Sequence, residues 1–198
     1  MSNYHQNIKD ALPDPKRVKK IKKDLESKGV KYIYSNWIDF LGSPKTKPMP
    51  ISDFEDLCAG KGPQFAVHSV SFVPELTPAD NDQIPVPDLD SLVICPWDKT
   101  CAWVFADLYW NDKPYDVCPR MTLKRQIKKC EKSDLKFFVG IEPEFFLMKW
   151  DGDKPVKAID RDPIPLRRQA FGYDAEYSID GMNFLKEIID ILNNDLKW

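Results

Sequence analysis

The sequence has little histidine, almost no net charge and no long apolar run. Its 198 residues include two histidines, His5 and His68, and a net charge of −2 from 29 basic and 31 acidic residues. That balance gives no electrostatic case for nucleic acid as the main partner. No apolar run approaches the roughly 20 residues that a membrane-spanning helix needs. We therefore expect neither a nucleic-acid partner nor a membrane partner.

The cysteines also exclude some classes of protein. Their number is odd and no two have the spacing CxxC; they are Cys58, Cys95, Cys101, Cys118 and Cys130. A structural zinc site is not expected, because neither histidine lies near a cysteine pair. Without a signal peptide, the pattern indicates reduced thiols in a cytoplasmic protein.

A basic run at 16–23 allows two interpretations. It could form a patch that binds anions or nucleic acid, or it could be the solvated face of an amphipathic helix. Val18, Ile21 and Leu25 recur at helical spacing, and Asp14 can cap the helix, so the pattern favours the second interpretation.

The length allows one large domain or two small ones, and 42% hydrophobic residues are enough for a core. β-branched and aromatic runs between turn signals predict strands at 30–40, 46–51, 91–97, 101–110, 113–117 and 136–149. Further helices are expected after Ser52, which begins a capping box, after Pro119, and at 179–196. The helix after Pro119 should turn Leu123, Ile127 and Cys130 inward. Segments 60–90 and 154–178 are expected to be irregular.

The most informative feature is a pair of carboxylates, Glu142 and Glu144, inside an otherwise apolar run. On a strand, side chains two residues apart point to the same face, and two bare carboxylates there need cations or donors. No lysine or arginine lies between Lys136 and Lys149, so a hard metal ion is the natural partner. The alternative is a solvated strand edge, which Pro143 favours because it donates no ladder hydrogen bond.

The run G-I-E-P-E-F-F-L at 140–147 resembles the motif that begins the catalytic domain of the glutamine synthetase family. Four more segments resemble that family in order and spacing: 33–51, 87–92, 96–97 and 118–120. The similarity runs from about residue 30 to residue 198. The style of the loops resembles the branch that contains the γ-glutamylmethylamide synthetases.

The resemblance implies an α+β chain with two domains. A lead and helix at 1–29 would precede a β-grasp domain at 30–117 and the N-terminal part of an α/β catalytic domain at 118–198. The alternating pattern after Cys118 needs more strands to bury its faces, so we expect the chain to end inside the catalytic domain.

The resemblance also implies an ATP-dependent ligase of glutamine biosynthesis and nitrogen metabolism. Such an enzyme phosphorylates the γ-carboxylate of glutamate, and ammonia or a small amine then attacks the γ-glutamyl phosphate. Two Mg²⁺ or Mn²⁺ ions would assist, with Glu142 on the ion that bridges the ATP phosphates and Glu144 on the ion nearer glutamate. The family forms homo-oligomeric rings with active sites between subunits.

The remaining metal, ATP and glutamate ligands of the family would lie beyond Trp198, so we expect the chain alone to be inactive. Tyr173 resembles a tyrosine at the mouth of the active site, although a packed loop tyrosine is the alternative. Arg167 and Arg168 could clamp a phosphate or belong to an exposed charged loop.

The expected ammonium site departs from the family. Members specific for ammonia carry F-D-G-S-S where this chain has F-A-V-H-S at 65–69, so Ala66 replaces an aspartate. This change favours an amine or another nucleophile, unless Asp80 or Asp82 substitutes.

A second hypothesis is a non-catalytic family member, or a fragment, that acts through oligomer assembly. A small calcium-binding module is not supported, because the sequence has no Asp/Asn/Gly loop of twelve-residue spacing.

Overall fold

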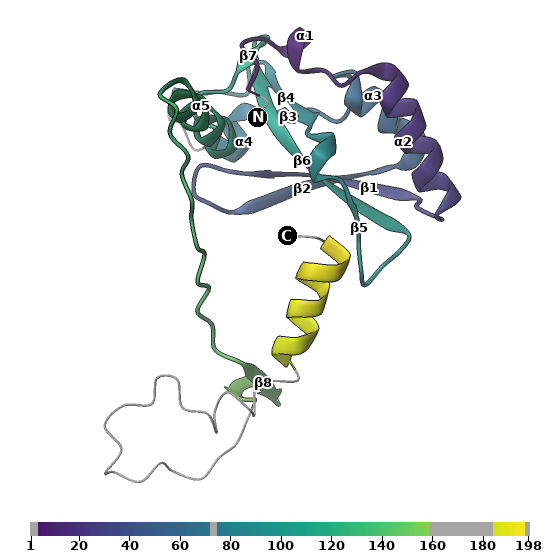
Figure 1. The fold of residues 1–198 in the computed structure, drawn as a ribbon, viewed down its shortest axis with the longest axis vertical. Coiled ribbons are helices and arrows are strands. Elements are labelled where there is room, and N and C mark those ends of the chain that lie inside the picture. The colour runs from purple at the N-terminus through teal and green to yellow at the C-terminus, as the bar shows by residue number, and fades with distance from the viewer. Residues whose placement is uncertain (1–3, 72–74, 159–183, 197–198) are drawn as a thin grey trace. The chain divides into compact units, whose positions relative to one another are not determined.

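The computed structural model describes residues 4–71, 75–158 and 184–196. The chain forms two compact units, Met1–Phe137 and Phe138–Trp198. The first unit is mixed α/β with a curled sheet, drawn from purple to green in Figure 1.

The sheet of the first unit is built around one long strand, β6. The order is β2-β1-β6-β4-β3, and β5 and β7 also pair with β6. The strands are β1 (Tyr32–Ile38), β2 (Pro44–Pro50), β3 (Phe65–Ala66), β4 (Asp82–Pro87), β5 (Val93–Ile94), β6 (Cys101–Trp110) and β7 (Lys113–Pro114). β1 runs parallel to β6, and the other pairs are antiparallel. Because β6 has partners on both sides, most of its residues are buried.

Several helices belong to the first unit. They are α1 (Ile8–Ala11), α2 (Pro15–Ser27), α3 (Phe54–Cys58), α4 (Val67–Ser71) and α5 (Pro119–Lys132), with 3₁₀ turns at Ile51–Asp53 and Leu89–Ser91. The predicted start of α2 is confirmed, because the Asp14 carboxylate accepts from the amides of Lys16 and Arg17. Val18 and Leu25 are buried and most of the basic residues are exposed, so the basic run is a solvated helix face.

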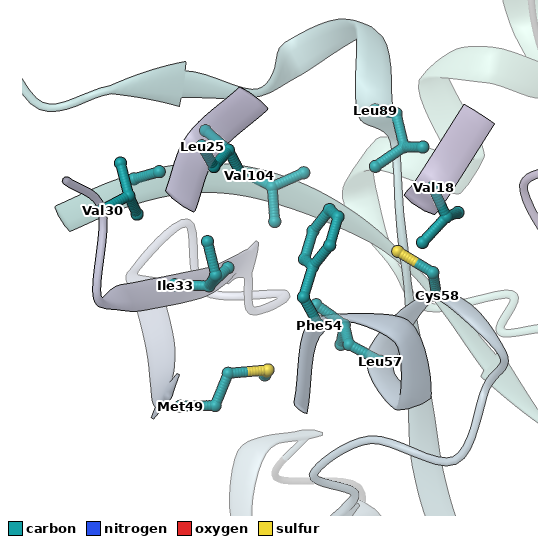
Figure 2. Packing of buried hydrophobic residues seen from close by; sticks show 11 residues of the cluster. Val18, Leu25, Val30, Ile33, Met49, Phe54, Leu57, Cys58, Leu89 and Val104 are labelled. Atoms are coloured by element: carbon teal, nitrogen blue, oxygen red, sulfur yellow. The ribbon is translucent and has the colours of Figure 1, made fainter. Parts of the chain in front are cut away.

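The core lies where α2 and α3 meet the sheet (Figure 2). Figure 2 shows side chains from both helices and from three strands in one cluster; among them are Val18, Leu25, Ile33, Met49, Phe54, Leu57 and Val104. Phe54 and Leu57 have no exposed surface. Burying such a side chain contributes about 1.5–3 kcal/mol, so this cluster fixes both helices on the sheet. A second cluster, which includes Trp37, Tyr109 and Met121, holds α5.

The predicted hairpin at the start of the sheet is confirmed. β1 and β2 pair antiparallel from Tyr32 opposite Pro50 to Ile38 opposite Pro44. The predicted strand 101–110 coincides with β6, whereas strands 91–97 and 113–117 shrink to short bridges. A helix does begin near Ser52, but no capping box forms, since the Ser52 hydroxyl donates to Asp53 instead.

The prediction that residues 60–90 are irregular is wrong for β3, α4 and β4. The last of these contains Pro85 and Pro87. Alternate amides of a strand point to opposite sides. The amide of Asp88 donates to the Phe105 carbonyl on β6 at 2.8 Å, so the nitrogens of both prolines face away from β6. Proline has no amide proton to donate, but at these two positions β4 therefore loses no hydrogen bond to β6.

The predicted inward face of α5 is wrong for two residues. Leu123 is 60% exposed and Ile127 is 40% exposed, and Cys130 is half-buried. The helix buries Met121 and Lys124 instead. Met121 joins the second core cluster, and the Lys124 ammonium finds carboxylates on the sheet, so these two contacts select the buried face.

The second unit contains a hairpin and a helix. β8 (Met148–Asp151) pairs antiparallel with β9 (Lys154–Lys157) around the predicted turn, where Gly152 has φ +59°. Residues 184–190 are helical and continue into a π-helical segment, Ile191–Leu196, which confirms the described part of the predicted last helix. The expected irregularity of 154–178 is wrong at β9.

The strand predicted at 136–149 is wrong over 136–147. These residues pair with no strand in the described part of the chain, and only β8 takes up the end of the predicted range. A strand is stable only when a neighbour satisfies its backbone groups and covers its apolar face. Here Phe138 and Phe146 are 87% and 93% exposed, so no described residue provides that neighbour. The predicted domain limits at 29, 117 and 198 stay predictions.

Candidate functional site

The two predicted metal ligands lie in the extended segment between α5 and β8, drawn in Figure 1 as a trace without helix or arrow. The side chains of Glu142 and Glu144 are both exposed. Within the described residues, neither carboxylate forms an ion pair or a hydrogen bond. As far as the described residues go, their oxygens are free to accept a cation, and carboxylate oxygens are the ligands that Mg²⁺ and Mn²⁺ prefer.

The surroundings of the pair are apolar but open to water. Ile141 is 85% exposed, and Phe145 packs edge-on against Phe184 with the ring centroids 5.7 Å apart. A phosphoryl-transfer site has to exclude water and surround its ions with several ligands. The described residues provide the two carboxylates without that enclosure.

No third ligand completes the pair in the ranges that the structure describes, where no group of three or more His, Cys, Asp or Glu residues could hold a metal ion. His68 lies in α4, where its ring nitrogen is 3.4 Å from the Ser69 hydroxyl. His5 lines a pocket beside α1. Glu142 and Glu144 thus fit a divalent ion by their chemistry, but they supply only part of its shell.

Three other residues singled out from the sequence cannot be placed. Tyr173, Arg167 and Arg168 lie outside the described residues. Their roles stay predictions.

The structure distinguishes the two aspartates that could replace the one missing at Ala66. Ala66 on β3 lies directly opposite Asp82 on β4 in the antiparallel register. Cross-strand neighbours have Cβ atoms about 4.5–5.5 Å apart, so the Asp82 carboxylate can reach the space beside Ala66. Asp80 instead accepts from the amide of Thr77 at 2.7 Å in its own turn. Asp82 is exposed and is the better candidate.

The sequence analysis missed a cluster of four charged side chains between α5 and the sheet. Lys124 Nζ lies 3.1 Å from Asp88 Oδ2 and 2.5 Å from Asp107 Oδ2. Arg120 Nε lies 2.8 Å from Asp107 Oδ1, and its terminal nitrogen also pairs with Asp88. The two cations and two anions balance, so the cluster fastens α5 to β4 and β6.

Burial alone would raise the pKa of Asp88, but Lys124 and Arg120 outweigh it and hold this pKa below its ordinary value. Asp88, Asp107 and Lys124 also border a pocket of about 230 Å³, whose lining includes the Arg17–Asp90 ion pair. The only sequence signal for this cluster is that Arg120 and Lys124 lie four residues apart on a predicted helix. Their aspartate partners are distant in sequence.

No helix in the described ranges is both long and apolar enough to span a membrane.

Comparison with known proteins gives consistent matches. The family model for the glutamine synthetase catalytic domain matches residues 116–196. A glutamine synthetase of Rhizobium meliloti is 33% identical over 171 residues, which are 86% of this chain and 37% of that relative. A glutamate–methylamine ligase of Methyloversatilis universalis is 32% identical over 127 residues, or 63% of this chain and 28% of that relative.

Solved structures match as well. A GmaS–ADP complex is similar with a TM-score of 0.68 and 25% identity, over 86% of this chain and 38% of that one. GmaS without ligand matches in fold, with a TM-score of 0.66 and 22% identity over 90% of this chain. The chain thus spans 28% to 40% of the length of these relatives.

Proposed function

The chain belongs to the glutamine synthetase family of ligases, and from that premise we propose that it forms the N-terminal part of an ATP-dependent ligase. That enzyme would join the γ-carboxylate of glutamate to ammonia or a small amine through a γ-glutamyl phosphate. The position of Glu142 and Glu144 carries this proposal. Both lie inside the range matched by the catalytic-domain model, and both carboxylates are free within the described residues.

In this proposal the two glutamates would hold Mg²⁺ or Mn²⁺ through their carboxylate oxygens. Glu142 would hold the ion on the ATP side of the site, and Glu144 would hold the ion nearer glutamate. When bound, such ions neutralise charge that develops on the transferred phosphoryl group. Tyr173 would lie at the mouth of the same site.

The accepting nucleophile is a small amine such as methylamine. Ala66 leaves space for an alkyl group where ammonia-specific members carry a carboxylate, and one relative is a glutamate–methylamine ligase. Asp82, opposite Ala66, supplies the negative charge from the neighbouring strand and can hold an alkylammonium ion before it loses a proton.

The rest of the proposal concerns assembly. Residues 30–117 form a β-grasp domain, and 118–198 begin the catalytic domain of a cytoplasmic, ring-shaped homo-oligomer. The exposed apolar segment 138–147 supports this, because it needs a covering surface from the remainder of the enzyme. The chain alone does not turn over substrate, since two carboxylates cannot fill two octahedral shells.

A chimera tests the proposal. Residues 1–196 replace the aligned part of the Rhizobium meliloti glutamine synthetase, and ADP release is followed with glutamate, ATP, Mg²⁺ and either ammonia or methylamine. We expect turnover with a preference for methylamine. Changing Asp82 to Asn should raise KM for methylamine by about tenfold, as expected for one lost charge-assisted bond.

The controls separate the two glutamates from general effects on the fold. Glu142→Gln and Glu144→Gln should each reduce turnover by at least about a hundredfold, because the loss of an ion ligand removes charge stabilisation at the transferred group. Asp153→Asn, an equally exposed carboxylate in the β8–β9 turn, should leave turnover unchanged. A folded chimera that assembles into a ring without turnover would support the assembly-only alternative instead.

A further inference from the structure

A pair of cysteines lies at the end of the β5–β6 hairpin. The register places Val93 opposite Trp103 and Ile94 opposite Ala102, so the next facing pair is Cys95 and Cys101. The amide of Cys95 donates to the carbonyl of Cys101 at 2.9 Å, which extends the ladder to this pair. The two cysteines are therefore direct cross-strand neighbours with side chains on the same face.

The spacing of such neighbours suits a disulfide. Facing residues in a hydrogen-bonded antiparallel pair have Cα atoms about 5.5 Å apart. Disulfides join Cα atoms about 4.4–6.8 Å apart, most often near 5.5–6 Å. We propose that Cys95 and Cys101 are a redox-sensitive dithiol that oxidised glutathione, or a similar small disulfide, converts into a cross-strand disulfide.

The turn between the cysteines holds the Cys101 sulfur in place. The Asp98 carboxylate accepts from the amide of Thr100 at 3.0 Å and from the Cys101 thiol at 3.2 Å. The Trp97 ring packs edge-on against Trp103 with centroids 5.0 Å apart. Disulfide formation would break the bond from the Cys101 thiol to Asp98, whereas the backbones are already aligned by the ladder bond between Cys95 and Cys101.

The other described cysteines lack this arrangement. Cys58 lies in α3 and Cys118 caps α5, and both are buried at positions without a facing cysteine. They serve as internal controls within the same chain.

The reaction balances with one small disulfide. A thiolate of the pair attacks one sulfur of oxidised glutathione, which forms a mixed disulfide and releases one glutathione thiolate. The second cysteine, deprotonated, attacks the mixed disulfide at the protein sulfur and releases the other glutathione thiolate. The two protons from the cysteines go to these leaving groups, and two electrons pass to glutathione.

Attack by Cys95 is slow at neutral pH. Burial first, and the neighbouring Cys101 thiol second, raise the pKa of Cys95 to about 11. Since the thiolate is the reactive form, the rate of attack by Cys95 should rise roughly tenfold per pH unit below that value. Oxidation fixes the turn that carries Trp97, whose side chain is 61% exposed. The proposal does not rest on ligase activity.

Peptide mapping of the folded chain tests the proposal. The chain is incubated with oxidised or reduced glutathione at mildly alkaline pH, blocked with iodoacetamide and cut with trypsin. Cleavage after Lys99 separates the two cysteines in the reduced chain. After oxidation we expect these two peptides to stay linked through Cys95 and Cys101, with both sites protected from alkylation while Cys58 and Cys118 are alkylated on unfolding. Dithiothreitol should restore both thiols.

Two results would overturn it. One is full alkylation of Cys95 and Cys101 after the oxidising incubation, and the other is a linkage to a different cysteine or between two chains on a non-reducing gel. The Cys95→Ser variant should stop at a mixed disulfide on Cys101 or stay a free thiol. The mapping of the unchanged chain decides the question even if that variant does not fold.

Discussion

Replacing Lys124 with methionine removes a cation that the buried Asp107 and the half-buried Asp88 share. Its ammonium lies 3.1 Å from Asp88 and 2.5 Å from Asp107, and its side chain is only 11% exposed. Methionine is unbranched and of similar length, so the change leaves little cavity. What it removes is the charge that compensates the two aspartates.

The expected cost follows from the burial of the cluster. Removing one partner of a buried ion pair costs about 3–5 kcal/mol. Arg120 still contacts both carboxylates, so we expect the lower end, about 3 kcal/mol off the free energy of unfolding. Lys128→Met makes the same chemical change one helical turn away at an exposed position and should cost less than about 0.5 kcal/mol.

The assay is urea unfolding of the chain followed by tryptophan fluorescence at several pH values. The pKa of Asp88 is lowered in the folded state, so its stabilising contribution is complete above the unfolded value near pH 4 and is lost as pH falls through the folded value. The difference between the wild type and Lys124→Met should therefore shrink in acid.

Two outcomes would refute this reasoning. A Lys124→Met chain as stable as the Lys128→Met chain would show that the cluster contributes no net stability. A difference of the same size at neutral and acid pH would show that lost packing, and not lost charge, causes it. A double-mutant cycle with Asp88→Asn should give a coupling energy of about 1–3 kcal/mol.

Two further changes probe the first unit. Gly62→Ala places a Cβ 2.6 Å from the Cα of Leu57 and should lower the free energy of unfolding in urea by about 1–3 kcal/mol. In the control Gly140→Ala, the new Cβ meets no atom within 4 Å, so the free energy of unfolding should change by less than about 0.5 kcal/mol. Equal effects of the two changes would contradict the close packing of Gly62 against Leu57. Asp39→Ala removes the acceptor for two turn amides, including that of Ser43 at 2.8 Å, and should lower the urea midpoint at neutral pH. Burial acts to raise the pKa of Asp39, but these bonds and Lys45 hold it below its ordinary value. The loss should therefore fade in acid as the carboxylate is protonated, and a loss of unchanged size in acid would argue against this role.

The elements predicted well were those with a local cause. The β1–β2 hairpin follows from β-branched and aromatic residues around a turn that contains Gly42, whose φ is +84°. The start of α2 follows from Asp14 and Pro15. In each case the determining residues are adjacent in sequence, so the sequence alone was sufficient.

The elements predicted badly depend on distant partners. β4 can form because the nitrogens of Pro85 and Pro87 face away from β6. No local sequence pattern reveals that orientation. The buried face of α5 depends on Asp88 and Asp107, which lie 36 and 17 residues from Lys124. An apolar pattern alone therefore pointed to Leu123 and Ile127.

In the candidate site, too, the residues could be predicted from the sequence but their secondary structure could not. The apolar context of Glu142 and Glu144 identified them, and the structure leaves their carboxylates free within the described residues. The strand that should carry them does not form, because strand formation needs a neighbouring strand that the described residues do not supply. Tyr173 lies outside those residues and is untested.

The most direct test of the proposed function compares Mg²⁺-dependent ADP release by the chimera with that of its Glu142→Gln variant. The proposal predicts that glutamate, methylamine and ATP give turnover in the parent and that turnover falls at least about a hundredfold in the variant, with the ring assembly retained. Equal turnover in the two proteins would contradict a metal-binding role for Glu142. A folded parent ring that releases no ADP would contradict the ligase itself.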